Sequence, residues 1–175
     1  MKMQSRSFAL TCVVALLSAC SEDRPLVAPE LIADLPEGAI QAVVQQSPGV
    51  EPGTTVYTVR VVGRSAKVAS YQGQLTFTKG TLSVVSVNTP TAPDGEVHIV
   101  NSTQAAEGKI RFAAYATEAF GTDEAFSVVV RSATAALPDL TATLDVAGSA
   151  EGRAMAGTLM RASSGIRDVN GKLLR

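Results

Sequence analysis

The side chain best suited to covalent chemistry in this sequence is the thiol of Cys20, which follows Leu17, Ser18 and Ala19 directly. A cysteine sulfur is a nucleophile, and in this stretch it is the only atom that can form a thioether with a lipid group. Ser18 and Ala19 are small enough for the narrow site of a peptidase that cuts just before the cysteine. These residue types therefore suit cleavage by a peptidase beside Cys20 and a thioether on its sulfur.

The residues before this site have the composition of an export signal. Lys2 and Arg6 supply positive charge, and residues 8–17 form an almost wholly apolar run that is too short to span a bilayer. With its Leu-small-small-Cys ending, the stretch resembles the lipobox of bacterial lipoproteins. The resemblance implies that residues 1–19 are a signal peptide and that acyl chains on Cys20 hold the protein in the bacterial cell envelope.

Removal of residues 1–19 also limits what the remaining chain can do. It takes away Cys12, the only other cysteine, so we expect no disulfide and no cysteine metal ligand. It takes away Lys2 and Arg6 and leaves 13 basic against 16 acidic residues, which argues against nucleic acid as a partner. Ser21 becomes the second residue of the mature chain. An aspartate at that position would resemble an inner-membrane retention signal, and Ser21 is not one, so in a two-membrane cell we expect the protein in the outer membrane.

Catalytic residue sets are sparse. The single histidine, His98, lies in an apolar stretch that is typical of a strand, and a hydrogen-bonded strand histidine is the favoured interpretation. Serines are abundant, so a Ser-His-Asp set stays open, but the Gly-x-Ser-x-Gly turn of many hydrolases is absent from the sequence. We therefore expect a protein that is not an enzyme and that needs no cofactor.

Two acidic stretches are candidates for calcium binding. Asp123 and Glu124 follow a glycine in a predicted loop, and Asp168 to Gly171 begins like a calcium-binding loop without the acidic residue that should follow. Neither has the alternating carboxylates of a complete site. A solvated loop and a plain turn are the favoured interpretations, and no metal site is predicted.

Residues 20–37 are predicted to be an extended tether between the lipid and a folded domain at residues 38–175. Pro25, Pro29 and Pro36 favour an extended chain. Apolar residues are interspersed among them, so a short docked segment stays open as an alternative; they are Leu26, Val27, Leu31 and Ile32.

The folded part is predicted to be all-β. Short stretches with alternating apolar residues are separated by turn residues about every ten positions, the pattern of an antiparallel sandwich. The predicted strands are residues 39–45, 56–62, 68–78, 82–87, 97–100, 109–116, 125–131 and 140–146, with a final hairpin turning at Asn170-Gly171. Alternation places three sets on inward faces: Tyr57, Val59 and Val61; Ala69, Tyr71, Gly73, Leu75 and Phe77; and Ile110, Phe112 and Ala114.

The order of these strands resembles a cohesin domain. The resemblance runs through VYTVRVVGRSAKVASYQGQLTFTKGTLSVVSV, then GEVHIVN, GKIRFAAYA and AFSVVVRSA, and covers about residues 54–146. It implies a nine-stranded antiparallel jelly-roll sandwich, related in fold to certain carbohydrate-binding modules. It also implies a non-catalytic role in which the domain binds a protein, as known cohesins bind dockerins.

Two candidate binding surfaces follow. Gln72, Gln74, Thr76 and Thr78 point away from the predicted core, and such a polar face suits a protein partner, either dockerin-like or another envelope protein, although an ordinary solvated face has the same pattern. Tyr115 lies opposite Phe112 on the outer side of its strand, where it is the one aromatic residue placed to stack on a sugar. Polysaccharide binding is therefore the alternative function.

Overall fold

A computed structural model describes residues 38–64, 67–132, 138–150, 160–161, 163–164, 166–168 and 172–174. The predicted signal peptide (residues 1–19) and tether (residues 20–37), with Cys20, lie outside the described residues. Within the described ranges, no helix has the length and apolar character needed to cross a membrane.

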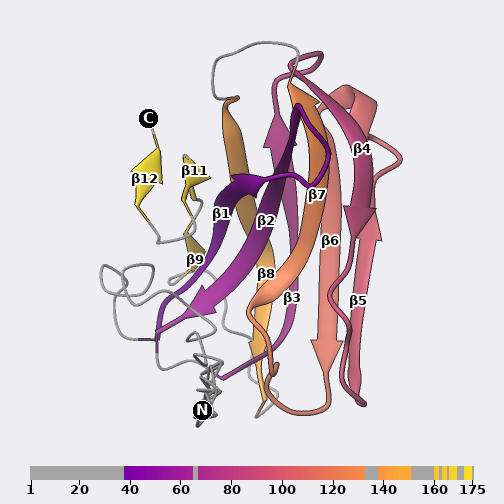
Figure 1. The fold of residues 1–175 in the computed structure, drawn as a ribbon. Coiled ribbons are helices and arrows are strands. Elements are labelled where there is room, and N and C mark those ends of the chain that lie inside the picture. Colours follow the sequence, from indigo (N-terminus) through magenta and orange to yellow (C-terminus); the bar gives the residue numbers. More distant parts are fainter. Residues whose placement is uncertain are drawn as a thin grey trace, which may run out of the picture.

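The described chain forms two β-sheets that pack face to face, as the sequence predicted (Figure 1). Eight strands of six to ten residues make up most of both sheets: β1 (Ile40–Pro48), β2 (Thr54–Gly63), β3 (Val68–Phe77), β4 (Leu82–Asn88), β5 (Glu96–Asn101), β6 (Lys109–Ala116), β7 (Glu124–Ser132) and β8 (Leu140–Ser149). Two-residue strands follow: β9 (Met160–Arg161), β10 (Ser163–Ser164), β11 (Ile166–Arg167) and β12 (Leu173–Leu174). A short 3₁₀ turn, η1 (Ala105–Glu107), precedes β6.

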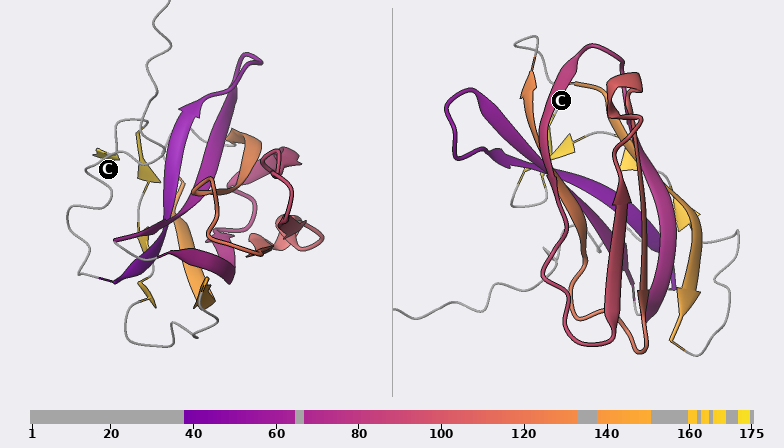
Figure 2. Two further views of the ribbon diagram at one scale, coloured as in Figure 1. Left: turned by 90° about the horizontal axis from the view of Figure 1, so that it is seen from below. Right: turned by 90° about the vertical axis from the view of Figure 1, so that its right-hand side faces the viewer.

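One sheet has the order β12-β11-β1-β2-β7-β4, with β9 also paired to β1, and the other has the order β10-β8-β3-β6-β5. The turn between β1 and β2 projects away from the body of the sandwich (Figure 2). Val50 at its tip is fully exposed.

The sandwich is antiparallel, as predicted, except beside β1. β9 and β11 both pair with β1 in the parallel sense, with Ile40 opposite Met160 and Val44 opposite Ile166. Between them, β10 pairs with β8 in the other sheet. These strands are far from β1 in the sequence and are not joined to it by a hairpin. Because no tight turn fixes their direction, they can pair with β1 in the parallel sense.

The final hairpin does form, because β11 and β12 are antiparallel with Arg167 opposite Leu173. Asp168 and Lys172 close its loop: the Asp168 N–H donates to the Lys172 carbonyl at 2.9 Å, and the Lys172 N–H donates to Asp168 Oδ1 at 2.9 Å. The predicted turn residues Asn170 and Gly171 lie outside the described residues. The carboxylate of Asp168 therefore takes part in a turn, which is the interpretation that the sequence favoured.

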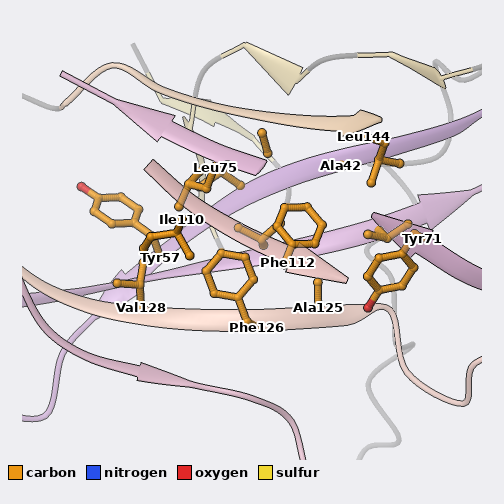
Figure 3. Packing of buried hydrophobic residues seen from close by; sticks show 14 of the residues in the cluster. Ala42, Tyr57, Tyr71, Leu75, Ile110, Phe112, Ala125, Phe126, Val128 and Leu144 are labelled. Atoms are coloured by element: carbon orange, nitrogen blue, oxygen red, sulfur yellow. The ribbon is translucent and has the colours of Figure 1, made fainter. Parts of the chain in front are cut away.

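The core lies between the sheets and is built by strand alternation. Every inward residue predicted for β2, β3 and β6 that has a side chain is buried, with Val59, Leu75 and Ile110 all fully enclosed. Phe112 and Phe126 meet in the middle of this layer with ring centroids 5.3 Å apart, and Tyr71 packs edge-on to Phe112 at 6.1 Å (Figure 3). These contacts fix which face of each strand is turned outward.

Candidate functional site

Strand β5 has the reverse of the usual alternation for the edge of a sandwich. Its first two inward positions carry Glu96 and His98, whose side chains are only 8% and 2% exposed, and only the third, Val100, packs an apolar side chain against the core. Its outward positions carry Val97 and Ile99, which are 52% and 60% exposed. Since burying apolar area stabilises a fold and burying ionisable groups costs free energy, folding alone does not account for this arrangement. The pattern places β-branched apolar side chains on the surface.

These two residues belong to an apolar area that continues across the outer face of the five-stranded sheet. Val97 lies opposite Tyr115 of β6, and Ile99 lies opposite Ala113 of the same strand. Ala113 in turn faces Gln72 of β3, and Gln72 faces Val146 of β8. Tyr115 and Val146 are 58% and 54% exposed. We call Val97, Ile99, Ala113, Tyr115 and Val146 the apolar area.

The other half of the same outer face is polar. Asn101 of β5 lies opposite Arg111 of β6, and Arg111 lies opposite Gln74 of β3. Thr76 lies between Lys109 and Thr141, and its hydroxyl donates to the Thr141 carbonyl at 3.3 Å. The face therefore combines exposed apolar side chains at one end with hydrogen-bonding groups at the other, the composition typical of protein interfaces.

On the inner side of β5, a chain of polar contacts holds the strand in place. Glu96 Oε1 accepts a hydrogen bond of 2.7 Å from the Gly121 N–H, and Glu96 Oε2 lies 3.4 Å from His98 Nε2. The other ring nitrogen of His98 lies 3.5 Å from the Tyr71 hydroxyl, and its ring packs on Phe120 at 5.6 Å. The contacts connect β5 to the loop before β7 and to β3.

Tyr71 is the buried phenol at the end of this chain of contacts. Burial raises the pKa of its hydroxyl, and the nearby negative charges of Glu96, Asp123 and Glu124 raise that pKa further. The Tyr71 hydroxyl therefore stays protonated as a hydrogen-bond donor. His98 is enclosed and fully occupied by neighbours, so this histidine supports the strand rather than facing a substrate.

The candidate calcium ligand Asp123 is also occupied by a protein group. Its Oδ1 accepts a hydrogen bond from the Arg60 guanidinium, and its side chain is 7% exposed. Burial raises the pKa of Asp123, and the charge of Arg60 acts in the opposite direction. Among the described residues, no group of three His, Cys, Asp or Glu side chains is arranged to hold a metal ion. An arginine stands where a cation would have to bind.

The structure brings together four of the five predicted surface residues. Gln72, Gln74 and Thr76 lie on the outer face of β3, and Tyr115 lies diagonally across from Gln72 on β6. Thr78 comes after the end of β3, in a turn where its carbonyl accepts hydrogen bonds from the Thr81 N–H and hydroxyl. Thr78 is therefore at the margin of the face.

Sequence reasoning found Tyr115 but missed the aliphatic residues of the apolar area. The segment Glu96-Val97-His98-Ile99 carries a signal that could have revealed half of them, because a buried Glu and His on alternate positions force both aliphatic residues outward. Val146 had no such signal. It is turned outward by a register shift between β3 and β8, beside Gln72 and Gly73, that leaves both Asp145 and Val146 exposed.

The aromatic residues argue against the alternative of polysaccharide binding. Tyr57, Tyr71, Phe77, Phe112 and Phe126 are all buried, and Tyr115 is the only largely exposed aromatic side chain in the described part of the chain. Crystalline polysaccharides are usually bound by several coplanar rings. The outer face of the sheet offers one ring among aliphatic side chains, so the structure does not favour the sugar-binding interpretation.

No family model and no curated protein matches this sequence. Solved structures do match. A chain of a type I cohesin–dockerin complex from Clostridium thermocellum is 14% identical, covers 75% of this chain and 99% of its own length, and has a TM-score of 0.52. The cohesin module of a family 33 glycoside hydrolase from Clostridium perfringens is 9% identical, with coverages of 75% and 98% and a TM-score of 0.51. The seventh type I cohesin of ScaB from Pseudobacteroides cellulosolvens is 14% identical, with coverages of 78% and 96% and a TM-score of 0.52. With its two packed sheets, this chain therefore has the fold of a cohesin module.

Proposed function

We propose that this protein is a non-catalytic module that binds another protein through the outer face of the β8–β3–β6–β5 sheet. The observation that carries the proposal is the reversed pattern of β5, which exposes Val97 and Ile99 while burying Glu96 and His98. With Tyr115 and Val146, these side chains form an apolar area beside polar groups. Such an area on a soluble domain is suited to a partner that covers it.

The proposed partner is a protein of the dockerin class or an envelope protein with a matching apolar surface. Two solved structures with this fold are complexes of a cohesin with a dockerin, one from Clostridium thermocellum and one from Acetivibrio cellulolyticus. Their similarity to this chain supports the class of partner as a proposal. The apolar area and the neighbouring Arg111, Gln74 and Thr76 define what the partner must offer: apolar side chains at one end and hydrogen-bonding groups at the other.

The test uses matched single substitutions on the two sheets. Ile99→Asp places a charge in the apolar area, and Val85→Asp places one on β4, whose Val85 is 43% exposed on the other sheet. Titration calorimetry against purified dockerins encoded by the same organism should show binding that Ile99→Asp weakens by about 30-fold or more, the effect of losing one dominant interface residue. Val85→Asp should bind normally. Equal affinities for the two variants would exclude this face as the interface.

We further propose that a lipid on Cys20 holds the module at a membrane. The support is the sequence alone: a charged start, an apolar run at residues 8–17 and the Leu-Ser-Ala-Cys ending. Cells fed a fatty acid with a clickable tag should incorporate the tag into the wild-type protein and not into Cys20→Ser. Tagging of Cys20→Ser at the wild-type level would contradict the anchor. In a two-membrane bacterium we expect the wild type in the outer-membrane fraction.

A further inference from the structure

Asn101 ends strand β5, and the two residues after it complete a motif that the proposed function does not use. In Asn101-Ser102-Thr103, a residue with a hydroxyl stands two positions after an asparagine, and the residue between them is not proline. In exported proteins this Asn-x-Ser/Thr pattern is the acceptor sequence for N-linked sugars. The other asparagines lack the pattern, because Asn88 is followed by Thr-Pro and Asn170 by Gly-Lys.

The structure places Asn101 where an enzyme can reach it. β5 is the last strand of its sheet among the described residues, and it lies at the edge of the sandwich in Figure 1. Alternation turns the Asn101 side chain to the outer face, on the same side as Val97 and Ile99. Asn101, Ser102 and Thr103 are all exposed, and the chain leaves the sheet directly after them for the short turn η1.

Thr103 holds the Asn101 side chain in a defined orientation. Asn101 Oδ1 accepts a hydrogen bond of 3.0 Å from the Thr103 N–H and one of 2.7 Å from the Thr103 hydroxyl. Two donors on this oxygen stabilise negative charge there, which makes a proton of Nδ2 easier to remove. The described part of the chain provides no acceptor for Asn101 Nδ2, whereas Asn88 Nδ2 donates to the Ser86 hydroxyl at 3.5 Å. The exposed amide nitrogen of Asn101 is therefore open to reaction.

We propose that Asn101 is an acceptor site for an N-linked sugar. The donor is a sugar activated at its anomeric carbon by a diphosphate, which a nucleotide or a membrane lipid carries. Asn101 Nδ2 loses a proton to a base of the transferase and forms a bond to the anomeric carbon. The bond between that carbon and the diphosphate oxygen breaks, and the diphosphate leaves with the electron pair.

A sugar on Asn101 would stand at the polar end of the outer sheet face. Asn101 lies opposite Arg111 of β6, and Gln74 of β3 lies on the far side of Arg111. If this face binds a protein, as proposed above, the sugar leaves the apolar area as the accessible part of it. That consequence rests on the proposed function, whereas the modification of Asn101 is independent of it.

The experiment measures the mass of one peptide of the protein purified from the organism that encodes it. Trypsin cuts after Lys79 and Lys109, so the peptide of residues 80–109 contains both Asn88 and Asn101. Fragmentation by electron transfer assigns any added mass to one residue. We expect at least one sugar residue on Asn101 and none on Asn88. An unmodified peptide, the small mass gain of deamidation alone, or a sugar only on a serine or threonine would overturn the proposal.

Matched substitutions test the part played by the hydroxyl. Thr103→Ser keeps the hydroxyl, Thr103→Val removes it with little change of shape, and Ser102→Ala alters only the residue between. We expect Thr103→Ser and Ser102→Ala to keep the sugar. Thr103→Val should lower the ratio of modified to unmodified peptide about 5-fold or more, the effect on a rate of one lost hydrogen bond. Circular dichroism checks that these exposed substitutions leave the fold intact, and an unchanged ratio in folded Thr103→Val would exclude the proposed acceptor geometry.

A further variant distinguishes the two carriers of the sugar. Leu10→Arg and Leu16→Arg together interrupt the apolar run of residues 8–17, which keeps the chain inside the cell if that run is the export signal. The same peptide is then measured. A sugar that is still present on Asn101 assigns a nucleotide-linked donor in the cytoplasm, and a sugar that is lost assigns a lipid-linked donor that acts after export.

Discussion

Gly73 lies on the inward side of β3 at the point where the register between β3 and β8 shifts. A Cβ at this position would overlap the backbone carbonyl oxygen of Thr143 on β8 and would come within 2.7 Å of Phe112 Cζ. The φ angle of Gly73 is not in the left-handed region, so an alanine here would suffer steric overlap but no backbone strain. Because a backbone oxygen cannot rotate away, β8 itself would have to move.

Two other glycines make it possible to separate lack of space from backbone strain. Gly53 has a φ of 75° and no atom within 4 Å of its would-be Cβ, so Gly53→Ala meets strain without overlap. Gly108, which ends η1, has a φ of 81° and a would-be Cβ that overlaps the Phe77 carbonyl oxygen, so Gly108→Ala meets both. Alanine in the left-handed region costs about 1 kcal/mol, and overpacking a filled core costs about 1–3 kcal/mol.

We therefore expect Gly53→Ala to lower the free energy of unfolding by about 1 kcal/mol. Gly73→Ala should lower it by about 2–3 kcal/mol, near the upper end for overpacking, and Gly108→Ala by about 3–4 kcal/mol. Urea unfolding followed by far-UV circular dichroism measures all three on one scale. If Gly73→Ala costs no more than Gly53→Ala, the close approach of β3 and β8 at this position is wrong. If Gly108→Ala matches Gly53→Ala, the overlap with Phe77 is wrong.

Two further predictions concern buried ionisable groups. Burial raises the pKa of Asp123, so the stabilisation from its protonated form is present at low pH and is lost as the pH rises through that raised pKa. The unfolding free energy of the wild type relative to Asp123→Asn should therefore fall as the pH rises above about 4, the ordinary pKa of an aspartate, and a difference that grows with pH would contradict the assignment. Burial also raises the pKa of Tyr71. In an alkaline absorbance titration of the phenols, Tyr71→Phe should remove the last group to ionise before unfolding, and persistence of that last step would show that another tyrosine is the more deeply buried.

The fold was predictable because most of its strands carry their own alternation. In β2, β3 and β6 every second residue is apolar, and Tyr57, Leu75 and Phe112 are buried as that period requires. The predicted strand over residues 109–116 has the bounds of β6, and the other long strands differ by one to three residues at their ends. Local sequence determines these strands because the alternation of apolar residues within a strand, together with the turn residues beside it, is enough to locate it.

The candidate site was only partly predictable because it depends on contacts between distant segments. The outward direction of Val146 follows from a bulge that arises only when β8 pairs with β3, and residues of β8 alone do not specify it. The parallel pairing of β11 with β1 likewise joins residues more than a hundred positions apart. The faces of β5 could have been assigned from its sequence, but a rule that places apolar residues inside gives the wrong answer there.

The buried Glu96 and His98 have a consequence for the behaviour of this protein in concentrated solution. β5 is the last strand of its sheet in the described structure, and an edge strand with exposed β-branched residues such as Val97 and Ile99 is a template on which further strands of other molecules can grow into aggregates. Charged residues that point inward on an edge strand are one of the ways in which proteins discourage such growth, because an added strand would have to pack its own side chains beside them. The inward carboxylate of Glu96 thus allows β5 to keep an apolar outer surface while its edge resists fibrous self-association.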